Sequence, residues 1–212
     1  MFREDVRLES AYTPVEEPSE WWLKGLAVFM ALLGLLYAFS AFASGITPAI
    51  MEETVFSFEW EQIEPYPENG TQEEKDEWEE GRMAWQDMLE YNEEMVEVIQ
   101  ISALHSGLLA IIAFLSTILL WTGNRDIGIK SFGAWIGVNT LGGFWMMWKW
   151  SAIGFTPLDD YGPEAGGTLI PDIINTLSFT LGAVQIACCN IVLLSILALI
   201  SVKSRPEVVL KE

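Results

Sequence analysis

Residues 98–130 read VIQISALHSGLLAIIAFLSTILLWTGNRDIGIK, a long stretch without Asp, Glu, Lys or Arg that ends in a short connector carrying Arg125 and Lys130. At a rise of about 1.5 Å per residue, such a stretch crosses a hydrocarbon layer of about 30 Å as one α-helix. A buried helix in a soluble core rarely stays uncharged over this length. We therefore interpret residues 98–122 as a membrane span.

Three further stretches have the same character, namely Gly25–Ile50, Ser131–Trp148 and Ile173–Val202. The sequence therefore predicts an all-α integral membrane protein, a bundle of four transmembrane helices with spans at residues 23–50, 98–122, 131–152 and 172–202. One alternative concerns the first span, because Ala41-Phe42-Ala43 resembles the cleavage site of a signal peptide. The six acidic residues before this span are atypical of a signal peptide, so we expect the span to be retained.

The basic residues collect on one set of connectors: Arg3, Arg7 and Lys24, then Arg125 and Lys130, then Lys203, Arg205 and Lys211. By the positive-inside rule, these connectors are cytoplasmic. The sequence thus predicts a multi-pass protein of the cell membrane with both termini cytoplasmic, in segments 1–22 and 203–212, and with a cytoplasmic loop at 123–130. Residues 51–97 and the Gly/Pro-rich loop 153–171 are then external.

The first external segment, residues 51–97, is called the acidic module below. The whole chain carries a net charge of -19, and seventeen of its thirty carboxylates lie between Glu52 and Glu97. Nucleic acid is excluded as a partner because its recognition requires a basic surface. Basic protein surfaces or cations are the partners that the charge favours. The alternative is that the carboxylates only keep the module solvated.

The acidic module has its own pattern of apolar residues. Phe56, Phe58 and Trp60 alternate with polar residues, which predicts a short extended segment. Thr71 followed by Glu74 is typical of a capping box, and it predicts a helix from about Gln72 to Trp121 that is continuous with the second span. Aromatic residues of this helix, above all Trp78 and Trp85, recur at helical spacing.

An exposed aromatic stripe on an acidic helix needs a cover. The cover is either the Phe56–Trp60 segment of the same chain, a second copy, or another protein. The candidate interaction surface therefore consists of Phe56, Phe58, Trp60, Trp78 and Trp85. Asn69-Gly70-Thr71 in the same module is an acceptor pattern for N-glycosylation at Asn69.

Inside the spans, polar side chains are the first candidates for function because they are costly in lipid. They are His105, Asn139, Gln185 and Asn190. We expect a ladder of hydrogen-bonded bridges between helices, and the alternative is a polar path through the bundle. Gly133 and Gly137 have the spacing that lets two helices approach closely. The adjacent Cys188 and Cys189 are expected to pack as small apolar residues.

Catalytic and metal-binding motifs are missing from the sequence. A single histidine and two adjacent cysteines do not supply an ordinary tetrahedral zinc site, and Asp159, Asp160 and Glu164 lack the spacing of a calcium loop. We therefore expect no cofactor and no enzymatic activity. Beside the lipid bilayer, the expected partner is a second copy or another membrane protein.

The function that we expect is protein–protein assembly through the acidic module. A small channel or carrier with a polar path past His105 is the second hypothesis. An integral membrane enzyme acting on lipid is the third.

Overall fold

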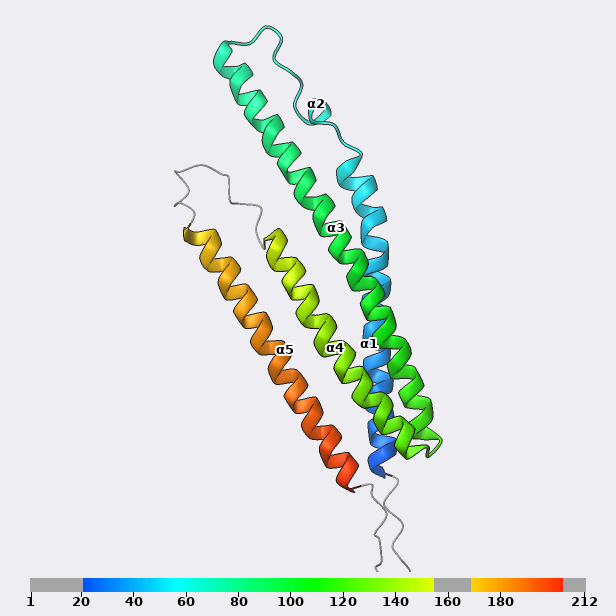
Figure 1. Ribbon diagram of the computed structural model, residues 1–212. Helices are drawn as coiled ribbons and strands as arrows, with labels where there is room; N and C mark the ends of the chain where they lie inside the picture. The colour runs from blue at the N-terminus through cyan, green and yellow to red at the C-terminus, as the bar shows by residue number, and fades with distance from the viewer. Residues whose placement is uncertain (1–20, 155–168, 204–212) are drawn as a thin grey trace, which may run out of the picture.

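The computed structural model describes residues 21–154 and 169–203, with only the helical backbone described for residues 169–172. Within these ranges the chain is all helical, without strands (Figure 1). The elements are α1 (Trp21–Met51), the π-helix η1 (Glu52–Phe56), α2 (Trp60–Ile63), α3 (Gln72–Trp121), α4 (Arg125–Ile153) and α5 (Leu169–Lys203). The loop that contains Asp159, Asp160 and Glu164 lies outside the described residues, as do both chain ends.

Three segments of the described chain are long and apolar enough to cross a membrane: Trp21–Phe56, Gln72–Trp121 and Ile173–Lys203. They cover the spans predicted at 23–50, 98–122 and 172–202, except for residues 122 and 172 at the span ends. The helix predicted as the remaining span, α4, is not among them. Its apolar residues are interrupted by glycines and by Lys149, and both lower its mean hydropathy.

The four long helices of the described chain lie side by side, and neighbours along the chain are neighbours in space (Figure 1). Helix α3 packs against α1 along much of its length and against α4, and α4 packs against α5. Only Thr122–Asn124 separate α3 from α4, so these two helices form an antiparallel hairpin. Gly123 has a φ of 78° in this turn, a conformation that glycine adopts without a steric cost.

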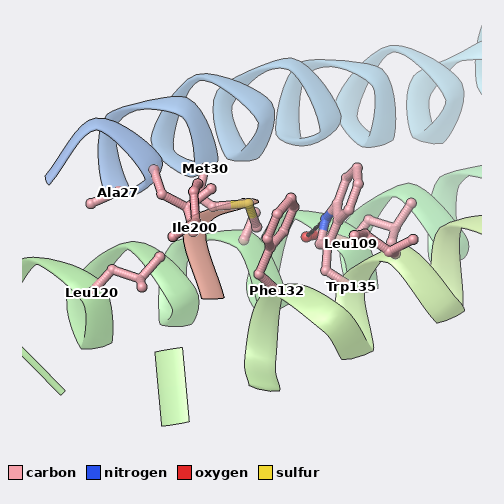
Figure 2. Packing of buried hydrophobic residues seen from close by; sticks show 10 residues of the cluster. Ala27, Met30, Leu109, Leu120, Phe132, Trp135 and Ile200 are labelled. Carbon is pink, nitrogen blue, oxygen red and sulfur yellow. Dashed lines mark hydrogen bonds between the residues drawn. The ribbon is translucent and has the colours of Figure 1, made fainter. Parts of the chain in front are cut away.

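The hydrophobic core lies where α1, α3 and α4 pack together (Figure 2). The end of α5 adds the buried Ile200, and its Leu193, Ile196 and Leu197 pack against the core. Phe132 and Trp135 of α4 lie at its centre, against Met30 of α1 and Leu109 of α3. The Trp135 indole is anchored there by its Nε1–H, which donates to the Leu109 carbonyl at 3.0 Å. Burial of this donor is therefore compensated.

The extended segment predicted around Phe56–Trp60 is wrong. Helix α1 instead continues into η1, and a second helical turn, α2, follows at Trp60. Extending an existing helix forms one hydrogen bond per residue fixed, so continuation outweighs a short alternating pattern. The side-chain hydroxyl of Thr54 donates to the Ile50 carbonyl at 2.7 Å, a contact made only in a helix. Extended backbone appears at Glu59, with φ and ψ of -91° and 149°.

The long helix predicted from Gln72 to Trp121 is confirmed as α3. It begins with the predicted capping box, in which the Glu74 carboxylate accepts from the Thr71 N–H at 2.6 Å and the Thr71 hydroxyl accepts from the Glu74 N–H at 3.3 Å. At 1.5 Å per residue, α3 is about 75 Å long, more than twice a hydrocarbon layer of about 30 Å.

Candidate functional site

A hydrogen-bonded polar bridge joins three helices near the middle of the bundle. The Tyr37 hydroxyl of α1 donates to Asn139 Oδ1 of α4 at 2.8 Å, and Asn139 Nδ2 donates to Asn190 Oδ1 of α5 at 3.3 Å. Asn190 Nδ2 in turn donates to the Ile186 carbonyl of its own helix at 2.8 Å. Asn190 is buried, and these two hydrogen bonds to protein atoms compensate its amide for the loss of water. This bridge holds α1, α4 and α5 together.

Asn139 and Asn190, which the sequence predicted as intramembrane polar residues, are thus brought together. Tyr37 was missed. Its signal was present, because it is the only tyrosine within the predicted spans, and a buried phenol usually finds a hydrogen-bond partner. The Tyr37 ring also packs edge-on against Trp135, with ring centroids 5.5 Å apart.

His105 of α3 lies directly over Gly142 of α4. A Cβ atom added to Gly142 would overlap the imidazole ring, so the absence of a side chain at this position lets His105 fit between the two helices. The ring makes no hydrogen bond to any residue that the structure describes. Next to it, the Ser106 and Ser40 hydroxyls are 3.4 Å apart and link α3 to α1.

Gln185 is, like His105, a predicted polar residue that does not join the bridge of Tyr37, Asn139 and Asn190. Gln185 lies on α5 and is exposed, and so are Cys188 and Cys189. Its amide makes no hydrogen bond within the described parts of the chain. Gln185 and the buried Asn190 therefore do not line one common path.

The close helix approach predicted at Gly133 and Gly137 is not found among the described residues. A Cβ added to Gly137 would meet nothing within 4 Å, and one added to Gly133 would meet only Leu197 at 3.6 Å. Close approach instead occurs at Gly142, and at Gly182 of α5, where an added Cβ would lie 2.7 Å from the Met147 sulfur. The four-residue spacing was therefore a poor guide to which glycines are in contact.

The aromatic residues of the acidic module pack mainly on one another. Trp60 lies between Trp78 and Trp85, with ring centroids 6.5 Å and 6.4 Å away, and Tyr66 meets Trp78 edge-on at 5.0 Å. Gly81 of α3 leaves room for the Trp60 ring, because an added Cβ would lie 2.7 Å from it. The cover of the aromatic stripe is thus supplied by the same chain, and Phe58 remains exposed.

Only one of the three indoles in this aromatic cluster is hydrogen bonded. Trp78 Nε1 donates to the Glu64 carbonyl at 2.8 Å. The Nε1 atoms of Trp60 and Trp85 are buried and have no acceptor among the described residues. Each such donor carries an uncompensated desolvation cost, which limits the stability of the cluster.

The outer surface of the module is anionic. All seventeen of its carboxylate residues are exposed. They face outward because the aromatic side chains occupy the interior of the hairpin formed by η1, α2 and the first part of α3. Asn69, the predicted glycosylation site, is exposed in the turn between α2 and α3.

Two contacts fix the other end of α4 against α3. Lys149 Nζ lies 3.8 Å from Glu97 Oε1, and the Tyr91 hydroxyl donates to the Gly154 carbonyl at 3.4 Å. Burial raises the pKa of the Tyr91 phenol above its ordinary value, so the phenol stays protonated and able to donate. Helix α4 therefore lies along the apolar part of α3 from end to end.

Comparison with family models, with curated proteins and with solved structures finds no match to this chain. In the described residues, no group of three or more His, Cys, Asp or Glu side chains is arranged to hold a metal ion.

Proposed function

We propose that this is a non-enzymatic polytopic membrane protein that acts by assembly, with the acidic module docking onto a basic surface of a neighbouring protein. The observation that carries the proposal is the division of the module into an aromatic interior and an outer surface on which every carboxylate is exposed. Trp60, Trp78 and Trp85 are engaged with one another, so the surface offered to a partner is mainly electrostatic.

The charge supports a basic partner. Against seventeen carboxylates, the module contains only two cations, Lys75 and Arg82. A surface of one sign steers a partner of the opposite sign and raises its association rate, and salt weakens this attraction. Basic protein surfaces are therefore favoured over neutral ones.

The rigidity of the module supports docking rather than simple solvation. Helix α3 runs without a break from the capping box at Thr71 into its apolar part, and the Trp60–Trp78–Trp85 cluster holds α2 against it. A surface that is already ordered loses little conformational entropy on binding. A segment that only had to stay soluble would need neither feature.

The proposal includes four spans, with α4 as the third. Gly128 of α4 packs against Leu120 at one end of α3, and Lys149 lies beside Glu97 at the other. If residues 98–121 cross the membrane, α4 therefore crosses it at the same depth. The side chains that α4 turns away from the bundle are mainly apolar and include Leu141, Phe144, Trp145 and Trp148. Such a surface is suited to lipid.

The orientation in this proposal follows the basic residues. The turn between α3 and α4 and the ends of α1 and α5 that carry Lys24 and Lys203 lie at one end of the bundle (Figure 1). The positive-inside rule places this end in the cytoplasm and the acidic module outside.

The channel hypothesis receives less support from the geometry. Asn139 and Asn190 donate and accept within a closed bridge, and Gln185 lies on another face of α5. A hollow of about 440 Å³ between the ends of α1 and α5 is lined by apolar side chains such as Trp21, Phe29 and Ile196. Conduction of ions requires polar groups along the path.

A photo-crosslinking experiment in native membranes tests the proposal. In one variant a photoreactive residue replaces Gln86, which is exposed on α3 within the module. In the lipid-facing control variant the same photoreactive residue replaces Leu141. At position 86 we expect crosslinked adducts to a basic protein, and the yield of these adducts should fall as the salt concentration is raised. At position 141 we expect no adduct to this protein.

Two charge variants locate the contact. Glu73, Glu77 and Glu80 are changed to Gln in one variant, and Asp87, Glu90 and Glu94 are changed to their amides in the other, so that the capping residue Glu74 is untouched. At least one variant is expected to lose most of the adduct. Only uncrosslinked monomer, or adducts that neither variant reduces, would contradict the proposal.

A further inference from the structure

Helix α5 is the least covered of the apolar helices. Of its most apolar window, 11% of residues are buried, compared with 33% for α3. Its covered face packs on α4, where Ile186 lies against Gly143, Met147 against Gly182, and Asn190 against Asn139. The remaining faces of α5 contact little else in the described chain.

One of these uncovered faces carries a regular stripe of residues. Its members recur at alternating intervals of four and three and are all exposed: Leu181, Gln185, Cys188, Val192, Ser195 and Leu199. A repeat of this kind averages 3.5 residues, the period at which two helices stay in contact along a left-handed crossing. Small members such as Cys188 and Ser195 allow the helix backbones to approach closely.

Gln185 makes this stripe unsuited to lipid. It lies near the middle of the predicted span 172–202, and its amide makes no hydrogen bond with any described residue. Lipid tails offer neither donor nor acceptor, so an amide exposed at this depth carries a desolvation cost until another helix satisfies it. The stripe is therefore a helix-pairing face with one polar contact at its centre.

We propose that this stripe pairs α5 with α5 of a second copy of the chain. Copies of one protein enter the membrane in the same orientation, so a two-fold axis along the membrane normal places each stripe residue opposite itself. A primary amide contains both donors and an acceptor, and two facing Gln185 side chains satisfy each other. Within the chain, Asn139 already donates one amide–amide hydrogen bond to Asn190.

The charge distribution agrees with this choice of edge. Helix α5 lies at the edge of the bundle, separated from α3 by α4, whereas the acidic module is carried by α1 and α3 (Figure 1). Pairing through α5 therefore brings two copies together without pressing their anionic modules against each other. The pairing rests on the membrane placement of the proposed function but uses a surface other than the acidic module, so either interface can fail in its own test while the other holds.

The two native cysteines test the pairing directly. Only Cys188 belongs to the stripe, and Cys189 is rotated from it by about 100°. The full-length protein in native membranes is oxidised with copper–phenanthroline and oxygen, which accept the two electrons and two protons released as two thiols form a disulfide. We expect a covalent homodimer for the wild type and for Cys189→Ser, and its loss in Cys188→Ser.

A second measurement keeps the test informative if oxidation within the membrane is slow. Self-association is followed by energy transfer between labelled copies in liposomes as the protein is diluted into lipid. Replacement of Gln185 by Leu should weaken the dimer about three-fold to about twenty-fold, the range expected for one interhelical hydrogen bond in a membrane. Leu194→Ala, on an exposed face outside the stripe, is the control and should leave association unchanged.

Three results would overturn the pairing. They are the absence of self-association in the dilution experiment, a homodimer that depends on Cys189 in place of Cys188, and adducts of Cys188 to another protein only.

Discussion

At the scale of single residues, the packing of the long helices is organised by a few polar contacts. Asn139 is the central residue, because it accepts from Tyr37 and donates to Asn190 and so links α4 to both α1 and α5. In a membrane, packing and hydrogen bonding replace the hydrophobic effect as the forces that hold helices together. The bridge is therefore a principal determinant of how α1, α4 and α5 associate.

Replacing Asn139 by Leu keeps the branching and the number of heavy atoms of the side chain and removes both hydrogen bonds of the bridge. We expect a loss of about 1–2 kcal/mol in unfolding free energy, because interhelical hydrogen bonds contribute about 0.6 kcal/mol each and Asn190 Oδ1 is left without a donor. Tyr37→Phe removes one bond and should cost about 0.6 kcal/mol. Reversible unfolding in mixed micelles measures both, and an Asn139→Leu protein as stable as the wild type would exclude the bridge.

Glycine 142 provides a second test at this scale. An added methyl group would meet the His105 ring, so Gly142→Ala should force the helices apart at a cost of about 1–3 kcal/mol. Gly137→Ala is the matched control on the same helix, where the added Cβ meets nothing within 4 Å, and it should leave stability unchanged or slightly higher.

The double variant His105→Ala with Gly142→Ala separates crowding from helix propensity. Removing the ring creates the space that the new methyl group needs, so part of the lost thermal stability should return. If Gly142→Ala and Gly137→Ala behave alike, His105 does not pack on Gly142.

The sequence shows which polar residues of the apolar helices need partners, but it does not show which partners they find. That Asn139 and Asn190 need partners follows from the cost of burying an amide, and the structure confirms that they are paired. Which groups serve as partners depends on how the helices are rotated. The rotation of each helix about its axis is set by packing around residues such as Trp135. This rotation cannot be predicted from the sequence of one helix.

At the scale of elements, α3 connects the helix bundle to the acidic module. Its start was predictable because the capping box is a local signal, and its length because no glycine pair or proline interrupts it. The segment before it was not predictable. Phe56, Phe58 and Trp60 alternate, but three apolar residues are too few to distinguish a strand from the frayed continuation of a helix.

Also at the scale of elements, we predict that two tryptophans of the acidic module contribute differently to its stability. Trp78→Phe and Trp85→Phe remove the same atoms, but only the Trp78 indole donates a hydrogen bond, to Glu64. Trp78→Phe should therefore destabilise the module by about 1 kcal/mol more than Trp85→Phe. Hydrogen exchange of the amides in the first part of α3 measures this difference, and equal protection in the two variants would contradict the packing described for the cluster.

At the scale of the whole molecule, charged and apolar residues are separated along the chain. The apolar character of three long helices is shown, and the end-to-end packing of α4 on α3 is the reason to include it as a span. Exposure of all seventeen carboxylates of the module follows from the inward packing of its aromatic residues. Both proposed interfaces depend on the four helices crossing the membrane together.

Cysteine accessibility in intact cells tests this topology most directly. In a background where Cys188 and Cys189 are serine, single cysteines are placed at Asn69 in the acidic module, at Ser151 near the far end of α4, and at Thr122 in the turn between α3 and α4. A membrane-impermeant maleimide should label positions 69 and 151 in intact cells and position 122 only after permeabilisation. Labelling of position 122 with protection of position 69 would contradict the external placement of the acidic module. Labelling of position 151 only after permeabilisation, as at position 122, would exclude α4 as a span.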